Sequence, residues 1–133
     1  MQYPGLELME ENEAEIVIVD RRIEPAVLGR LTRLFFEDMV KYVVDVERRL
    51  AAVGGELHAD AEQLLLAAGS RQFDLWGANY YPGKGREECI EYTSLINIRP
   101  AQGNRSMEIA DPTLQQRVRD LTFELLGEGE ALP

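Results

Sequence analysis

The prediction of the fold depends on residues 25–55, PAVLGRLTRLFFEDMVKYVVDVERRLAAVGG. Apolar residues recur there every three or four positions, which is the period of a helix with one buried stripe. The stripe consists of Val27, Leu28, Leu31, Leu34, Phe35, Met39, Tyr42, Val43, Val46, Leu50 and Val53. Pro25 suits a first helical turn, and Gly54-Gly55 suits a helix end. We therefore expect one long helix, although a length above that of an average helix also allows a kink near Gly29 or a break.

Short segments of strand character lie on both sides of this expected helix. Residues 16–19, Ile-Val-Ile-Val, are β-branched without polar alternation, which is typical of a strand buried on both faces. Residues 56–60 predict a second strand that leads into a helix capped by Asp60, with Gln63 completing a capping box. Because strand, helix and strand in succession form a βαβ unit, we expect two parallel strands with a right-handed crossover.

The second half of the chain predicts a hairpin and a last helix. Residues 73–81 and 89–98 have strand composition and flank a loop rich in Pro and Gly, so we expect them to pair antiparallel. Asp111-Pro112 is a strong helix start, and Gly127 suits the end of that helix. The order βαβαββα predicts an α+β fold, in which a mixed sheet of about four strands carries the long first helix.

The length of 133 residues predicts a single domain. We assign residues 15–127 to that domain, residues 1–14 to a flexible acidic segment and residues 128–133 to a flexible tail. Acidic residues concentrate at the two ends, at Glu7, Glu10, Glu11, Glu13, Glu128 and Glu130. These ends are interpreted as solubilising flanks rather than interaction tails.

Composition excludes several classes of function. A formal net charge of −10 argues against binding to nucleic acid or to an anionic membrane surface, because both require a surplus of Lys and Arg. The apolar runs are shorter than the roughly 20 residues of a membrane span, and the first residues do not form a secretory signal. Cys89 is the one cysteine, which fits a reducing compartment. We therefore expect a cytoplasmic protein.

Glu56, His58 and Asp60 form the first candidate site. Residues two apart on a regular strand share a face, so these three side chains would point the same way and hold a divalent metal or transfer a proton. The alternative is structural, with Asp60 as a helix cap, Glu56 solvated and His58 hydrogen-bonded. A single histidine and a single cysteine exclude a zinc site built from several of either within one chain.

An irregular loop after the last expected strand forms the second candidate site. It combines cationic, amide and hydroxyl side chains that suit a carboxylate or phosphate, namely Asn97, Arg99, Asn104, Arg105 and Ser106. In the structural alternative, the two arginines pair with acidic residues and Asn104 occupies a turn. Asn79, among Trp76, Tyr80 and Tyr81, could line a pocket together with these aromatic residues, although such residues more often form core.

Several stretches resemble a family of small prokaryotic proteins that is catalogued only as a domain of unknown function. They are Met39-Val40-Lys41, residues 54–60 (GGELHAD), Gly69-Ser70, residues 75–79 (LWGAN), and residues 96–100 (INIRP) followed by residues 103–106 (GNRS). The resemblance extends over about residues 15–125. It agrees with a prokaryotic cytoplasmic origin, and it implies no reaction, cofactor or catalytic residue.

Three functional hypotheses remain open. The first is a non-enzymatic domain that binds a small anionic ligand or a protein partner. The second is a metal-assisted hydrolase that uses His58 with Glu56 or Asp60, and Arg99 or Arg105 on the substrate. The third is a homo-oligomeric interaction module whose contact is the hairpin or the long helix. The sequence identifies no cofactor.

Overall fold

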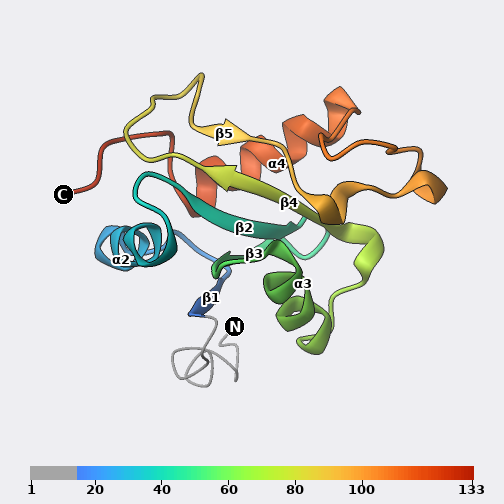
Figure 1. The fold of residues 1–133 in the computed structure, drawn as a ribbon, viewed down its shortest axis with the longest axis horizontal. Helices are drawn as coiled ribbons and strands as arrows, with labels where there is room; N and C mark the ends of the chain where they lie inside the picture. Colours follow the sequence, from blue (N-terminus) through green and yellow to red (C-terminus); the bar gives the residue numbers. More distant parts are fainter. Residues whose placement is uncertain (1–14) are drawn as a thin grey trace.

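The computed structural model describes residues 15–133 (Figure 1), so the predicted acidic segment 1–14 lies outside the described residues. The fold is α+β, which confirms the predicted class. The elements, with η for a 3₁₀ helix, are β1 (Ile16–Val19), α2 (Pro25–Phe35), β2 (Val40–Asp45), β3 (Leu50–Gly54), α3 (His58–Ala67), η1 (Gln72–Asp74), β4 (Leu75–Tyr80), β5 (Ile90–Glu91), η2 (Leu95–Asn97), η3 (Pro100–Gln102) and α4 (Pro112–Leu125). The strands of residues 15–133 form one five-stranded sheet in the order β1-β3-β2-β4-β5, and every neighbouring pair is antiparallel. The predicted mixed sheet of about four strands was therefore wrong.

The prediction of one helix from Val27 to Val53 was wrong as well. The helix α2 ends at Phe35, and Phe36 is already extended, with φ −131° and ψ 163°. The remaining residues form the hairpin of β2 and β3, in which Tyr42 lies opposite Val53. Both faces of these two strands are buried. Their apolar residues therefore do not alternate with polar ones, and by chance they continue the helical spacing of α2.

The predicted strand at residues 56–60 does not form, and neither does the βαβ unit. Gly54 and Gly55 have φ of 113° and 86°, which glycine tolerates and which turns the chain out of β3. The helix α3 then begins at His58, so Asp60 lies inside its first turn and is not its N-cap. The strand β1 lies at an edge of the sheet, antiparallel to β3.

Helices cover both faces of the sheet, and α3 and α4 lie on opposite sides of the strands in Figure 1. The face that carries Tyr42, Val53 and Ala78 packs against Leu31 of α2 and Leu121 of α4. A buried hydrogen bond of 2.6 Å between Tyr42 Oη and Thr122 Oγ1 ties the centre of the sheet to α4. The opposite face packs against α3 through one apolar cluster, which contains Ile16, Ile18, Val43, Leu50, Ala52, Ala61, Leu65 and Leu75.

Along the outer edge of β4, side chains form hydrogen bonds that a full neighbouring strand would otherwise form. The predicted antiparallel pairing with the following segment is confirmed, but it is limited to Asn79 opposite Glu91 and Tyr80 opposite Ile90. Farther along, the Asn97 side-chain amide accepts a hydrogen bond from Gly77 N and donates one to Gly77 O, both at 2.9 Å. After Glu91 the chain leaves the sheet, and the Asn97 side chain takes the place of a paired strand at Gly77. The predicted strand 89–98 is therefore wrong beyond Glu91.

The last helix follows its prediction. Asp111 Oδ1 accepts a hydrogen bond of 2.9 Å from Thr113 N, and α4 starts at Pro112. Beyond α4, Gly129 O accepts hydrogen bonds from the backbone nitrogens of Gly83 and Gly85. The predicted domain limits at residues 15 and 127 stay predictions. No helix of residues 15–133 combines the length and apolar character needed to cross a bilayer.

Candidate functional site

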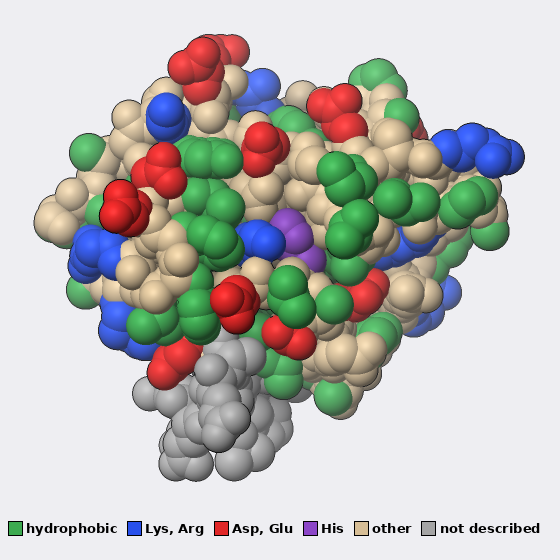
Figure 2. All heavy atoms as spheres, viewed as in Figure 1, with side chains coloured by type: hydrophobic (Ala, Val, Ile, Leu, Met, Phe, Trp, Pro, Cys, Tyr) green, Lys and Arg blue, Asp and Glu red, His purple; other side chains and the backbone are tan. Residues whose placement is uncertain are grey.

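A cavity of about 350 Å³ lies where the start of α3 meets the sheet, and we call it the His58 pocket. Its wall combines side chains from β2, β4, α3 and the segments around η2. The lining residues are Lys41, Leu57, His58, Ala59, Asn79, Thr93, Ser94, Leu95, Ile96 and Met107. Figure 2 shows the histidine on this face, beside a basic side chain and between hydrophobic side chains.

Gly77 allows the wall of this pocket to approach the sheet. A Cβ at Gly77 would lie 2.7 Å from Ser94 Cβ and 3.2 Å from His58 Cδ2. Carbon atoms do not pack at the shorter of these distances, so a side chain at this position would displace Ser94 or His58. Because Gly77 has no side chain, Ser94 and His58 can pack directly against β4.

His58 is a neutral hydrogen-bonding group at neutral pH. Its Nε2 lies 2.8 Å from the backbone oxygen of Ala78. Because a carbonyl oxygen only accepts, Nε2 carries the hydrogen and Nδ1 keeps a lone pair. Burial lowers the pKa of His58 to about 4, against the opposing effects of the Ala78 hydrogen bond and the nearby Asn79 side chain. The ring therefore adds no charge to the pocket.

Asn79 supplies a buried acceptor that has no donor. The residue is 7% exposed, and its Nδ2 donates a hydrogen bond of 2.8 Å to Glu91 Oε1. Within residues 15–133, no donor reaches Asn79 Oδ1 in hydrogen-bonding geometry. A buried polar atom without a partner costs free energy, about 1–3 kcal/mol. A ligand that donates a hydrogen bond here would recover that cost.

Lys41 supplies the positive charge of the pocket. It lies directly opposite Asn79 in the pairing of β2 with β4. Its charge contributes to the lowered pKa of His58, which places the ammonium group near the imidazole. Lys41 Nζ also lies 5.3 Å from the centre of the Phe36 ring, a cation–π distance. The pocket therefore presents a cation and a free acceptor side by side.

The rim of the pocket is apolar and exposed. Leu57, Leu95 and Met107 are 56%, 73% and 42% exposed. They come from the residue before α3, from η2 and from the loop that precedes α4. Because large apolar side chains gathered around polar groups are typical of ligand sites, this rim suits the hydrocarbon part of a bound molecule.

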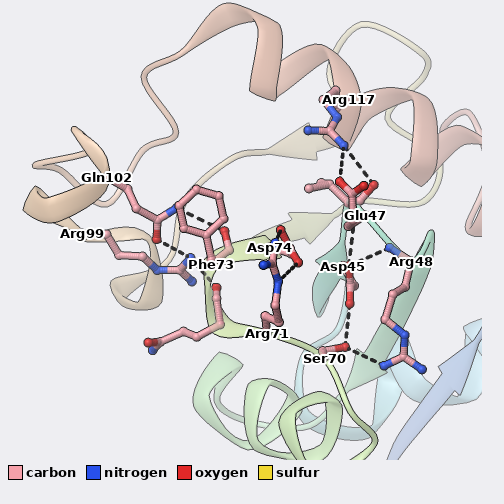
Figure 3. Close-up of polar contacts among 12 residues, drawn as sticks. Asp45, Glu47, Arg48, Ser70, Arg71, Phe73, Asp74, Arg99, Gln102 and Arg117 are labelled. Atoms are coloured by element: carbon pink, nitrogen blue, oxygen red, sulfur yellow. Dashed lines mark hydrogen bonds and ion pairs between the residues drawn. The ribbon is translucent and has the colours of Figure 1, made fainter.

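The structure does not bring the predicted site residues to one place. His58 and Asn79 line the same pocket, whereas Arg99 lies at the edge of β4. Arg99 donates hydrogen bonds to the backbone oxygens of Ile96, Gln72 and Leu75 and lies 3.5 Å from Glu62 Oε2. Its guanidinium also stacks 4.5 Å from the Trp76 ring. Figure 3 shows Arg99 beside Gln102 and Phe73. These contacts favour a structural role for Arg99.

Asn97 and Asn104 hold the loop that was predicted to bind an anion. Asn97 is fully buried and also donates to Met107 O, at 3.0 Å. Asn104 Nδ2 donates to Asn97 O, Ser106 O and Glu108 O, and its Oδ1 accepts from Ala110 N. Arg105 and Ser106 are exposed on the same loop. The two asparagines therefore have their hydrogen-bonding groups engaged within the loop and with β4.

Glu56, His58 and Asp60 do not share a face, because the strand that would align them is absent. Glu56 is exposed before the helix, His58 is the first residue of α3, and Asp60 is exposed in its first turn. Residues two apart on a helix point in different directions. Among residues 15–133, no three His, Cys, Asp or Glu side chains gather in a way that could hold a metal ion.

A larger cavity, of about 570 Å³, lies between η1, η3 and the start of α4. Its charged groups already have partners: Arg71 Nε lies 3.1 Å from Asp74 Oδ2, and Arg117 lies 3.5 Å from Glu47 (Figure 3). We prefer the smaller His58 pocket, because an unpaired buried acceptor is a more specific indication of a ligand than volume.

Sequence reasoning missed several residues of the His58 pocket. Lys41 was placed within the expected long helix, and Leu95 within an expected strand. One signal was present, since Lys41 interrupts a run of apolar residues that turned out to be buried. A cation within such a run requires a functional or structural explanation. Ser94 and Met107 carried no comparable signal.

Comparisons with known proteins place the chain in one family. No curated protein and no solved structure matches it. One family model matches residues 17–125, which is most of the chain and includes both Lys41 and the His58 motif. The chain therefore belongs to the family described as protein of unknown function (DUF5674).

Proposed function

We propose that this protein is a binding domain for a small organic molecule that carries an anionic group, held in the His58 pocket. Lys41 pairs with the anionic group, and Asn79 accepts a hydrogen bond from a neighbouring group of the ligand. The apolar rim covers the hydrocarbon part. The observation that carries the proposal is the buried, unpaired Asn79 Oδ1 beside a lysine in an open cavity.

The state of His58 supports binding over proton-transfer catalysis. A general acid or base works best when its pKa lies near the working pH. The pKa of His58 is lowered to about 4, and Nε2 is committed to Ala78 O. The imidazole is therefore a weak base at neutral pH, and it serves as a polar wall that orients the ligand.

The remaining expectations concern location and partners. We infer a cytoplasmic location from the single cysteine, and the absence of nucleic-acid partners from the net charge of −10. Self-association stays a prediction, which light scattering of the purified chain at several concentrations would test.

The binding function can be tested by a thermal-shift screen of small carboxylates and phosphates against three proteins. These are the wild type, Lys41→Met and Lys84→Met, in which the chain's other lysine serves as the matched control. A ligand at about 100 times its Kd should stabilise the wild type and the control by about 2.7 kcal/mol. The Lys41→Met variant should show little stabilisation. Equal stabilisation of all three proteins would place the site elsewhere and refute the proposal.

A further inference from the structure

Three polar side chains, one positive, one neutral and one negative, lie in a row across the sheet beside the His58 pocket. Lys41 on β2 lies opposite Asn79 on β4, and Asn79 lies opposite Glu91 on β5. Directly opposite residues on neighbouring strands project from the same face. A positive group, a neutral amide and a negative group therefore follow one another, and the amide oxygen between the charges has no donor within residues 15–133.

These side chains determine which two chemical groups a matching ligand carries. Lys41 requires an anionic or strongly accepting group, whereas Asn79 Oδ1 requires a hydrogen-bond donor. A simple carboxylate has no donor at neutral pH, so it would leave Asn79 Oδ1 unpaired and more deeply buried. A molecule with both an anion and a donor satisfies both side chains at once.

The pairing of β2 with β4 allows these two groups to lie close together in the ligand. Lys41 and Asn79 are directly opposite on strands about 4.8 Å apart, and the flexible lysine chain can bring its ammonium group to an anion bound beside Asn79. An α-amino acid has this arrangement, because its ammonium and carboxylate groups are bonded to one carbon atom. An α-hydroxy acid has the same spacing, but its hydroxyl carries no charge.

Glu91 distinguishes between these two ligands. Its Oε1 accepts hydrogen bonds from Asn79 Nδ2 at 2.8 Å and from Tyr81 Oη at 3.1 Å. This orients Asn79 so that Nδ2 faces the carboxylate and Oδ1 is left for the ligand. A negative charge next to the acceptor favours a positively charged donor over a neutral one. Resting on the proposed function, we propose that the ligand is a free α-amino acid with an apolar side chain.

The rim supports the apolar side chain of this ligand. Leu57, Leu95 and Met107 are exposed around a cavity of about 350 Å³. This volume lies near the lower end of the range of small-molecule sites, about 300–1,000 Å³. The carboxylate pairs with Lys41, the ammonium group donates to Asn79 Oδ1 near Glu91, and the side chain lies on the three apolar residues.

Calorimetric titration with matched probes tests this ligand class. The probes are L-leucine, 4-methylpentanoate without the ammonium group, 3-methylbutylamine without the carboxylate, and N-acetyl-L-leucine as a model of a peptide C-terminus. The proteins are the wild type, Lys41→Met, Glu91→Gln, and Glu88→Gln as the matched control at another exposed glutamate. Far-UV circular dichroism checks that each variant is folded.

We expect L-leucine to bind the wild type and Glu88→Gln with equal affinity. It should bind Glu91→Gln and Lys41→Met at least about tenfold more weakly than it binds the wild type. Each probe that lacks one charged group should bind the wild type about tenfold or more weakly than leucine. If 4-methylpentanoate or N-acetyl-L-leucine binds as tightly as leucine and Lys41→Met abolishes that binding, the amino-acid inference fails while the proposed function stands. If neither leucine nor any other apolar amino acid binds, the inference fails, and the thermal-shift screen with Lys41→Met decides the proposed function separately.

Discussion

At the scale of one residue, His58 makes the stability of the folded chain depend on pH. Burial lowers its pKa to about 4, whereas the unfolded chain titrates at the ordinary value of 6.5. Between these two pH values the unfolded chain binds a proton that the folded chain does not bind. The free energy of unfolding therefore falls as the pH drops from 6.5 towards 4, and this contribution is regained as the pH rises.

The size of this effect is about 3 kcal/mol, because each pKa unit corresponds to about 1.4 kcal/mol. Urea unfolding of the wild type and of His58→Gln at several pH values between 4 and 7 would measure it, since the carboxylates contribute equally to both proteins. The variant should lose stability less steeply than the wild type as the pH falls. Parallel pH profiles would show that His58 does not titrate as described.

Single residues also show what could be predicted about the site from the sequence. His58 was identified because carboxylates flank it two positions away on each side, and Asn79 because it lies among aromatic residues. Arg99 and Asn97 were identified as polar side chains of one loop, but their partners include backbone groups of β4. A sequence does not reveal which backbone groups lack a partner, so a ligand residue and a residue that completes a strand edge look alike.

At the scale of an element, Asn97 replaces part of a strand at the edge of β4. The variant Asn97→Ala would leave Gly77 N and Gly77 O without their partner, whereas Met107 O would keep its hydrogen bond from Ser94 N. Because each buried polar group without a partner costs about 1–3 kcal/mol, the free energy of unfolding should fall by at least about 2 kcal/mol. Hydrogen exchange at the Gly77 amide should also accelerate. Ser106→Ala, which removes one exposed hydrogen bond of the same loop, is the control and should change stability little. Unchanged exchange at Gly77 would contradict the role of Asn97.

The elements that were predicted correctly carry local signals at their own ends. The helix α4 was found because Asp111 caps it and Pro112 occupies its first turn. The strand β2 was missed because it is buried on both faces, so no period of two marks it. Its spacing continued the stripe of α2, and nothing local marked the break at Phe36. The burial of β2 follows from tertiary packing, which a local pattern cannot show.

At the scale of the whole molecule, the sheet joins two apolar clusters into one unit. Tyr42 and Val44 of β2 belong to the cluster under α2 and α4, whereas Val43 belongs to the cluster under α3. Trp76 and Leu75 of β4 divide between the two clusters in the same way. Neighbouring residues of one strand pack on opposite faces of the sheet. Unfolding of one cluster therefore also removes the strands on which the other cluster packs.

This arrangement predicts that residues 15–133 unfold in one cooperative transition. The single tryptophan, Trp76, reports on the α4 side of the sheet, so its fluorescence should respond to substitutions made on the α3 side. Leu65→Ala in α3 should lower the free energy of unfolding by about 2–5 kcal/mol, and the milder Ile18→Val in β1 by about 0.5–1.5 kcal/mol. For both variants, urea unfolding followed by Trp76 fluorescence and by far-UV circular dichroism should give the same midpoint, because two-state unfolding moves all signals together. A fluorescence midpoint that stays at the wild-type value while the dichroism midpoint falls would mean that the two faces of the sheet unfold separately.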